Sequence, residues 1–171
     1  MADVAAEAVV SKPLLYHYFS TKSDLYAATV HAATAELRAA TRHDPTLTPE
    51  AAMAAALDAH IDWIDQHSVA YQAVLQSGTN PDPRAREVID HSRNETITQL
   101  GDVIGLAEIN PSQRIALRGW VGFLEAASVE WLTVRAISKP DFAEILATSL
   151  TSLAHALRRE SYRVSHASTS T

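Results

Sequence analysis

Apolar residues recur at spacings of three and four along most of the chain between residues 25 and 157. This spacing places them on one face of an α-helix, and the strict alternation typical of a β-strand is absent. The pattern predicts helices over residues 25–42, 52–66, 68–76, 83–104, 115–137 and 142–157. The 115–137 segment is apolar nearly all round, so we expect it to be the most buried element.

Helix starts are marked by capping residues that stand next to prolines. Such residues bond the unpaired N–H groups of the first turn, and proline is tolerated there because it has no N–H group. The pairs in question are Thr48-Pro49, Asp82-Pro83 and Asn110-Pro111, together with the run Ser138-Lys139-Pro140-Asp141. Thr21 and Asp24 have the spacing of a capping box, which predicts another helix start at residue 22.

Composition supports an all-α fold, because 30 of the 171 residues are alanine and only 5 are glycine. The absence of cysteine excludes disulfides and thiolate metal sites, and fits a cytoplasmic protein. No apolar run reaches the length of a membrane span, and residues 1–10 lack the basic residues of a secretory signal. The net charge of −6, taken alone, argues against a nucleic-acid-binding protein.

Residues 5–26 nevertheless contain a pattern typical of a helix-turn-helix. A short alanine-rich helix is followed by a turn at Ala8-Val9-Val10-Ser11 and by a second short helix that Ser11 can cap. In such a motif the second helix enters the major groove of DNA. The stretch AAEAVVSKPLLYHYFSTKSDLY resembles the second and third helices of the TetR-type family of bacterial repressors, running into the fourth helix. The Leu-Tyr-His-Tyr-Phe run followed by Lys22 is the most specific part of the resemblance.

The resemblance implies an all-α protein with a partial helix-turn-helix head followed by a multi-helix regulatory and dimerisation bundle. We expect the head at residues 1–26, a ligand-binding and dimerisation domain at 27–160, and a flexible tail at 161–171. It also implies that Tyr18 and Phe19 belong to the core of the head. The residues that it assigns to DNA contact are Ser11, Lys12, Pro13, Tyr16, His17 and Lys22.

Two departures from the family pattern concern this head. Val9 stands where the family usually has glycine, and the chain starts inside the second helix of the motif, so the first helix is missing. We therefore expect poor operator binding unless that helix is restored, with Val4, Leu14, Leu15 and Phe19 left exposed. The alternative function is a truncated ligand-binding and dimerisation module without competent operator binding. The acidic excess lies mostly outside the motif, so the net charge does not exclude DNA as a partner.

The resemblance also implies a homodimer, formed by the last two long helices, and a cavity for an unknown small hydrophobic effector. A leucine stripe at bundle spacing supports the interface, namely Leu146, Leu150, Leu153 and Leu157. Alternatively, these leucines pack only within their own subunit. The pocket candidates, each of which could also be plain core, are His60, Trp63, Ile64, Tyr71, Leu75, Ile97, Leu100, Trp120, Phe123 and Leu124.

The sequence thus predicts a transcriptional repressor that a small ligand releases from DNA. Its eight histidines do not indicate a metal site, because no Glu-x-x-His pair is present. No phosphate-binding glycine loop and no nucleophile elbow occur either, so we expect neither enzyme activity nor a cofactor.

Overall fold

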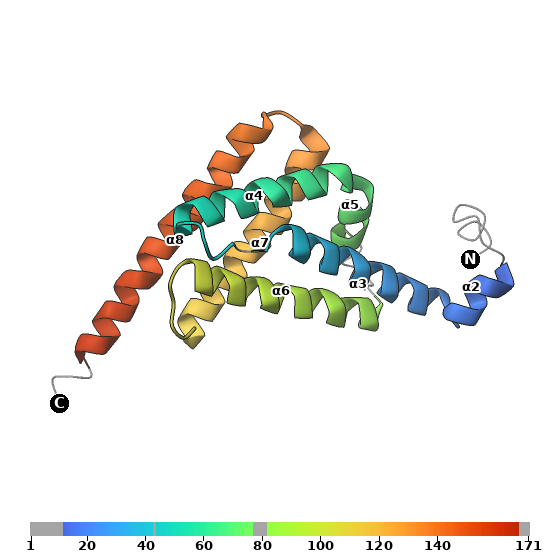
Figure 1. Cartoon of the computed structure of the whole chain (residues 1–171), viewed down its shortest axis with the longest axis horizontal. Helices are drawn as coiled ribbons and strands as arrows, with labels where there is room; N and C mark the ends of the chain where they lie inside the picture. The colour runs from blue at the N-terminus through green and yellow to red at the C-terminus, as the bar shows by residue number, and fades with distance from the viewer. Residues whose placement is uncertain (1–11, 43, 77–81, 168–171) are drawn as a thin grey trace.

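The computed structural model describes residues 12–42, 44–76 and 82–167, and within them the chain forms seven helices and no strand. The turn at residues 8–11, with Val9 and Ser11, lies outside the described residues. The predicted all-α class is confirmed. The helices, labelled as in Figure 1, are α2 (Lys12–Tyr18), α3 (Lys22–Ala40), α4 (Pro49–Gln66), α5 (Ser68–Gln76), α6 (Pro83–Val103), α7 (Pro111–Val134) and α8 (Lys139–Ala167).

The predicted helix starts are confirmed, and each has the expected cap. The Thr21 hydroxyl accepts from the backbone N–H of Asp24, whose carboxylate accepts in return from the backbone of Thr21. Asn110 and Gln113 form the same reciprocal box at the start of α7. The capping side chains of the remaining helices with a described cap are Thr48 for α4, Asp82 for α6 and Ser138 for α8.

Two helix ends differ from the prediction. Helix α7 stops at Val134 because Arg135 adopts a left-handed conformation, with φ of 53°. The guanidinium of Arg135 lies 4.3 Å from the ring centre of Trp131 and is 2.5 Å from the Asp65 carboxylate, which offsets the strain of this conformation. Helix α8 continues to Ala167, into the segment predicted as a flexible tail, because no proline or glycine follows Pro140 to interrupt it.

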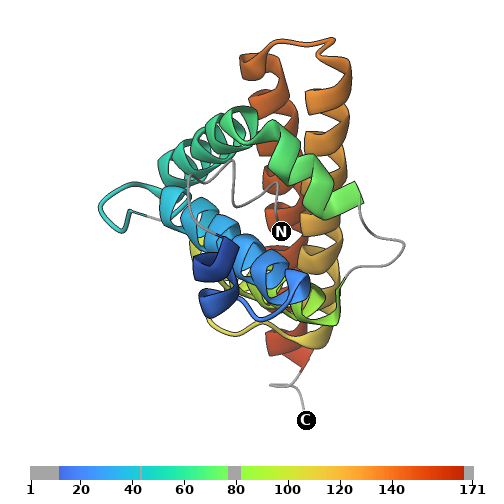
Figure 2. The ribbon, with the colours of Figure 1, turned by 90° about the vertical axis from the view of Figure 1, so that its right-hand side faces the viewer.

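The helices form a bundle from which α2 projects at one end. Helices α3 and α6 lie side by side, and α2 continues from the far end of α3 (Figure 1). Helices α7 and α8 pack against each other as a long pair (Figure 2), with α4 and α5 laid across them. Two segments that are distant in sequence, α3 and α6, thus build one side of the molecule, while α7 and α8 build the other.

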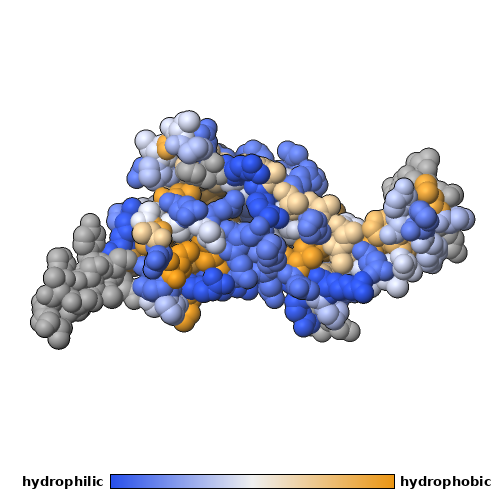
Figure 3. Space-filling model, turned by 60° about the horizontal axis from the view of Figure 1, so that its bottom comes forward, coloured by the Kyte–Doolittle hydropathy of each residue, from blue (hydrophilic) through white to orange (hydrophobic). Residues whose placement is uncertain are grey.

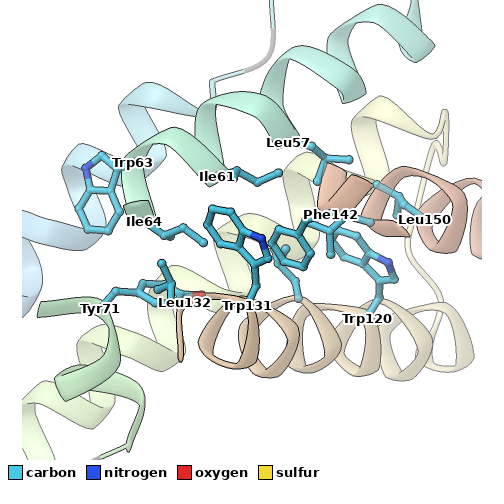
Figure 4. Packing of buried hydrophobic residues seen from close by; sticks show 12 residues of the cluster. Leu57, Ile61, Trp63, Ile64, Tyr71, Trp120, Trp131, Leu132, Phe142 and Leu150 are labelled. Atoms are coloured by element: carbon cyan, nitrogen blue, oxygen red, sulfur yellow. The ribbon is translucent and has the colours of Figure 1, made fainter. Parts of the chain in front are cut away.

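The main core lies between α4, α5, α7 and α8 (Figure 4). The Trp131 and Phe142 rings are stacked with their centres 5.1 Å apart, and Ile61 and Ile64 of α4 are completely buried above them. A second core, between α6, α7 and α8, contains Ile97, Ile104, Leu106, Leu117, Val121, Ala154 and Leu157.

The leucine stripe of α8 belongs to these cores and not to a surface. Leu146, Leu150 and Leu157 are buried within the protomer, with at most 4% of their surface exposed, and Leu153 packs against both cores. This burial favours the interpretation that the stripe packs within its own subunit. The i, i+4, i+7 spacing identified the apolar face of the helix. It did not indicate whether helices of the same subunit or of a second subunit cover that face.

Helix α7 has more buried residues than any other described helix, as predicted, but it is not buried on every face. Leu117, Trp120 and Leu124 are buried, but Ile115 and Phe123 are exposed on another face of the helix. The helix therefore presents an apolar face outward.

Hydrophilic residues dominate the face of the molecule drawn in Figure 3, with apolar patches over the bundle and at the α2 end. In the described part of the chain no helix is long and apolar enough to cross a membrane.

Candidate effector cavity and DNA-binding helix

Helix α2 presents most of the residues assigned to DNA contact to solvent. Pro13, Tyr16 and His17 are exposed on α2, and Lys22 is exposed at the first position of α3. Lys12 opens α2, and Ser11 lies outside the described residues. The side chains that are described are thus free to reach a phosphate or a base edge, which is the arrangement that recognition helices use.

The apolar side of α2 is only partly covered. Leu14 is 45% exposed, as expected, whereas Phe19, which was also expected to be exposed, is half-buried. Tyr18, predicted to be a core residue, is 71% exposed, and its ring contacts the His17 ring edge-on at 5.4 Å. The core assignment of Tyr18 is wrong, because α2 projects away from the bundle (Figure 1) and most of the Tyr18 side chain is left open to solvent.

The first turn of α3 is tied to the first turn of α6. The Ser23 hydroxyl donates to the Asp82 carboxylate, which also caps α6, and Arg84 of α6 pairs with Asp24. Hydrogen bonds lower the pKa of both carboxyl groups, that of Asp24 chiefly through Thr21 and that of Asp82 chiefly through Ser23. Both carboxylates therefore stay charged at neutral pH, and they link the segment that carries α2 to the bundle.

A mostly apolar cavity of about 170 Å³ lies inside the bundle, bounded by α3, α4, α5, α6 and α7, with α8 contributing Leu150. Most of the predicted pocket residues line it, namely His60, Trp63, Tyr71, Leu75, Leu100, Trp120 and Leu124. Ile64, Ile97 and Phe123 do not. Ile64 faces the main core, Ile97 belongs to the second core, and Phe123 is 40% exposed on the outer face of α7.

The sequence-based prediction missed the α3 wall of this cavity and, except for Leu100, the α6 wall. Helix α3 contributes a wall, as does the polar side of α6, because helical spacing identifies a face without saying which helix it meets. The residues missed on these walls are Val30, Ala33, Thr34, Leu37, Arg38, Thr41, Ile89, Ser92, Arg93, Thr96, Gln99 and Val103. Helix α3 thus carries α2 near one end and lines the cavity with its other half.

One end of the cavity holds a group of buried polar side chains. The His60 Nε2 atom is 3.2 Å from the Ser128 hydroxyl, and the His60 ring meets the Tyr71 ring edge-on with centres 6.1 Å apart. Burial lowers the pKa of His60 to about 4, so the imidazole is neutral at physiological pH. The Tyr71 hydroxyl is buried, and no described group makes a hydrogen bond to it within the usual geometry. Burial also raises the pKa of Tyr71, an effect that nearby Ser128 offsets only in part.

Two ion pairs stand at the α6 side of the cavity. Arg93 makes a two-pronged contact with Glu125 of α7, at 2.8 Å from Nε and 2.7 Å from the terminal nitrogen, and also pairs with Asp90. These bonds, led by Glu125, raise the pKa of Arg93. Arg38 of α3 pairs with Glu95 of α6. Each guanidinium beside the cavity is therefore already matched by a carboxylate.

Metal-ligating side chains do not gather anywhere in the described ranges. No group of three or more His, Cys, Asp or Glu residues there is placed to hold a metal ion. On α6 the spacing of one helical turn would also allow Glu87 and His91 to form a surface pair. The contact that His91 makes is with Glu95, at 3.6 Å.

Comparisons with known proteins agree with this architecture. Residues 49–153 match the family model described as "Tetracyclin repressor-like, C-terminal domain", and residues 1–29 match "Bacterial regulatory proteins, tetR family". A tetR-family transcriptional regulator from Streptomyces coelicolor superposes with a TM-score of 0.83 at 22% identity, over 93% of this chain and 73% of that one. A TetR-like transcriptional regulator from Rhodococcus sp. RHA1 gives 0.62 at 24% identity, over 88% and 79%. The two structures share the fold, and the family match covers more than half of the chain, so this protein belongs to the TetR family of bacterial transcriptional regulators.

Proposed function

We propose that the protein is a repressor that binds operator DNA as a homodimer and is released by a small hydrophobic ligand. The observation that carries the proposal is the position of α3, which lines the cavity with one half and holds α2 at the other end. A ligand that alters the packing around Leu37 changes the position of the same rigid helix to which the DNA-contacting segment is attached.

The DNA contacts of the proposal come from α2 and the start of α3. Tyr16 and His17 reach base edges and phosphates, Lys22 holds a phosphate, and Ser11, Lys12 and Pro13 act at the entry of the helix into the groove. Support comes from the exposure of the described members of this set. Phosphate contacts fix the position of the helix, and contacts with base edges supply the sequence preference.

The subunit interface of the proposal is the outward apolar face of α7 together with α8. Ile115, Gly119, Phe123 and Ala126 follow one another at helical spacing and are all exposed, and Ile145 is exposed on the adjacent helix α8. Small residues between the large ones allow two helices to approach closely. This face replaces the leucine stripe as the candidate for pairing two copies.

Size-exclusion chromatography with light scattering tests the interface. Phe123→Glu places a charge in the proposed contact, so we expect it to convert a dimer to a monomer. Val69→Glu is the matched control, because Val69 is an exposed apolar residue of α5, outside this face, and it should leave the dimer intact. A dimer that survives Phe123→Glu contradicts this placement of the interface.

Selection from a random duplex pool tests the DNA-binding function. The wild-type chain should enrich a palindromic site whose half-sites are spaced by whole helical turns, and the Tyr16→Ala, His17→Ala double variant should not. Folding of the variant is checked by circular dichroism. Absence of enrichment by a folded, dimeric wild-type chain would favour a ligand-binding and dimerisation module without operator binding, the alternative that the exposed Leu14 and Tyr18 support.

A further inference from the structure

The mostly apolar wall of the cavity contains a buried tyrosine hydroxyl without a hydrogen-bond partner of the usual geometry. Tyr71 lines the cavity, only 8% of its surface is exposed, and its hydroxyl has no hydrogen-bond partner among the described residues. A buried hydroxyl without a partner carries a substantial desolvation cost, so such groups in folded proteins are normally satisfied by a neighbour, a water or a ligand. The Ser128 hydroxyl lies nearby, where it partly offsets the rise in the pKa of Tyr71, and it is 3.2 Å from His60 Nε2, but no bond of the usual geometry joins it to the Tyr71 hydroxyl.

The missing partner is best matched by an acceptor. A ligand donor would bond the phenolic oxygen but leave the O–H hydrogen of Tyr71 buried without a partner, whereas an acceptor satisfies it. Two more buried groups of the wall lack a hydrogen-bond partner, the Nε–H of Arg38 and the indole N–H of Trp63, and each can only donate. Figure 4 shows the indole nitrogen of Trp63 turned away from Tyr71. The Trp63 and Tyr71 donors therefore do not compete for the same acceptor atom of a ligand.

The charges around the cavity favour a neutral ligand. Arg93 is held by Glu125 and Arg38 by Glu95, so neither guanidinium offers an unmatched charge to an anion. Because the wall is mostly apolar, a charged ligand would lose its hydration without a compensating ion pair.

The volume limits the size of the ligand. The cavity measures about 170 Å³, and an apolar protein cavity of about 150 Å³ accommodates benzene. A single ring with a short substituent therefore fills the available space, whereas a fused multi-ring compound would require the helices to move apart.

We propose that the cavity selects a neutral, single-ring compound with one hydrogen-bond acceptor, such as an aryl ketone, and that the Tyr71 hydroxyl donates to this acceptor. This inference rests on the proposed function, because it names the chemical class of the releasing ligand. It goes further in assigning a specificity-determining role to Tyr71 of α5.

Isothermal titration of the full chain with three related probes tests the proposal. Acetophenone carries the ring and an acceptor, ethylbenzene has nearly the same shape without it, and benzoate adds a charge. Wild-type protein should bind acetophenone roughly threefold to tenfold more tightly than ethylbenzene, as expected from one net hydrogen bond. Benzoate should bind most weakly.

Tyr71→Phe should remove the preference for acetophenone while keeping the affinity for ethylbenzene. Tyr18→Phe makes the same chemical change at an exposed position of α2 and should preserve the preference. Equal binding of acetophenone and ethylbenzene by the wild type, or a preference that survives Tyr71→Phe, overturns the assignment to Tyr71 but leaves the cavity as a ligand site. Binding of none of the three probes by the folded wild type overturns both this inference and the proposed effector site.

Discussion

At the α2 end Leu14, Tyr16 and Tyr18 are all exposed, and the helix is carried outward on the end of α3. Around the cavity, by contrast, Trp63 and Trp120 are buried between neighbouring helices. The first region leaves its side chains available to a large external partner, whereas the second encloses a space for a small one. The stability of the fold therefore resides in the bundle, and substitutions in the two regions should have very different consequences.

The largest contrast is expected between two leucine truncations. Leu146 is completely buried in the main core, so Leu146→Ala should lower the free energy of unfolding by roughly 2–5 kcal/mol through lost burial and a new void. Leu14 on α2 is 45% exposed, so Leu14→Ala should change it by about 0.5 kcal/mol or less. Urea denaturation followed by circular dichroism measures both. A cost at Leu14 equal to that at Leu146 would mean that α2 is part of the cooperative core.

The next largest difference between the cavity region and the α2 end should appear in the pH dependence of the free energy of unfolding. The pKa of His60 is lowered from 6.5 to about 4 by burial, so between these values the unfolded chain binds a proton that the folded chain does not. The free energy of unfolding therefore falls as pH falls, by about 1.4 kcal/mol per pH unit from this group, or roughly 2–3 kcal/mol from pH 6.5 to 4.5.

His60→Gln should flatten this slope by one proton, and urea titrations at several pH values measure it. His17→Gln replaces an exposed histidine of α2 and should keep the wild-type slope. If His60→Gln leaves the slope unchanged, protonation of His60 is not the source of the acid sensitivity.

A smaller effect is expected from the ion pair at the cavity wall. Glu125→Gln removes the charge of the main partner of Arg93, which keeps only the contact with Asp90. Because both side chains of the Arg93–Glu125 pair are about one-fifth exposed, we expect a loss of about 1 kcal/mol in thermal or urea unfolding. Arg84→Gln breaks the pair with Asp24 at the α3 start, and its effect should be smaller because the Arg84 side chain is 68% exposed. A larger loss from breaking the Arg84–Asp24 pair than from Glu125→Gln would mean that the ion pair at the start of α3 contributes more to stability than the pair at the cavity wall.

Substitution of Lys22 should have the smallest effect on stability, and it should change DNA binding only. Lys22→Gln should leave the unfolding curve unaltered, because the side chain is exposed. If Lys22 neutralises a phosphate, the slope of log affinity against log salt should decrease by about one unit on a selected operator. Lys139→Gln is the control, since that lysine pairs with Asp62 at the start of α8. An unchanged slope for Lys22→Gln contradicts the phosphate contact.

Local signals in the sequence were sufficient for the helices, and the longer-range arrangement was not. Thr48, Asp82 and Asn110 predicted their helix starts because capping depends only on residues within one turn. The predicted pocket residues lie on α4, α5, α6 and α7, and most of them line the cavity. Its α3 wall was missed, because nothing near Leu37 indicates which helix lies opposite.

Two assignments that the burial disfavours, the leucine stripe as an interface and Tyr18 as a core residue, have the same physical origin. The spacing of Leu146 and Leu150 identified an apolar face correctly, but a helix buries such a face equally well against its own subunit or against another. Tyr18 was assigned to a core because the resemblance supplied a neighbouring helix that no described residue provides. The contact between Arg93 and Glu125 joins positions on different helices and leaves no periodic trace in the sequence.

Helix α3 has the geometry of a lever. Its 19 residues correspond to ~28 Å of rigid rod at 1.5 Å per residue, with the cavity along the half that contains Leu37 and α2 attached beyond Lys22. A tilt of about five degrees at one end moves the other by ~2.5 Å, a large fraction of the rise of one base pair. The tie between Ser23 and Asp82 sits near the moving tip, so it sets how much of that displacement the bundle permits.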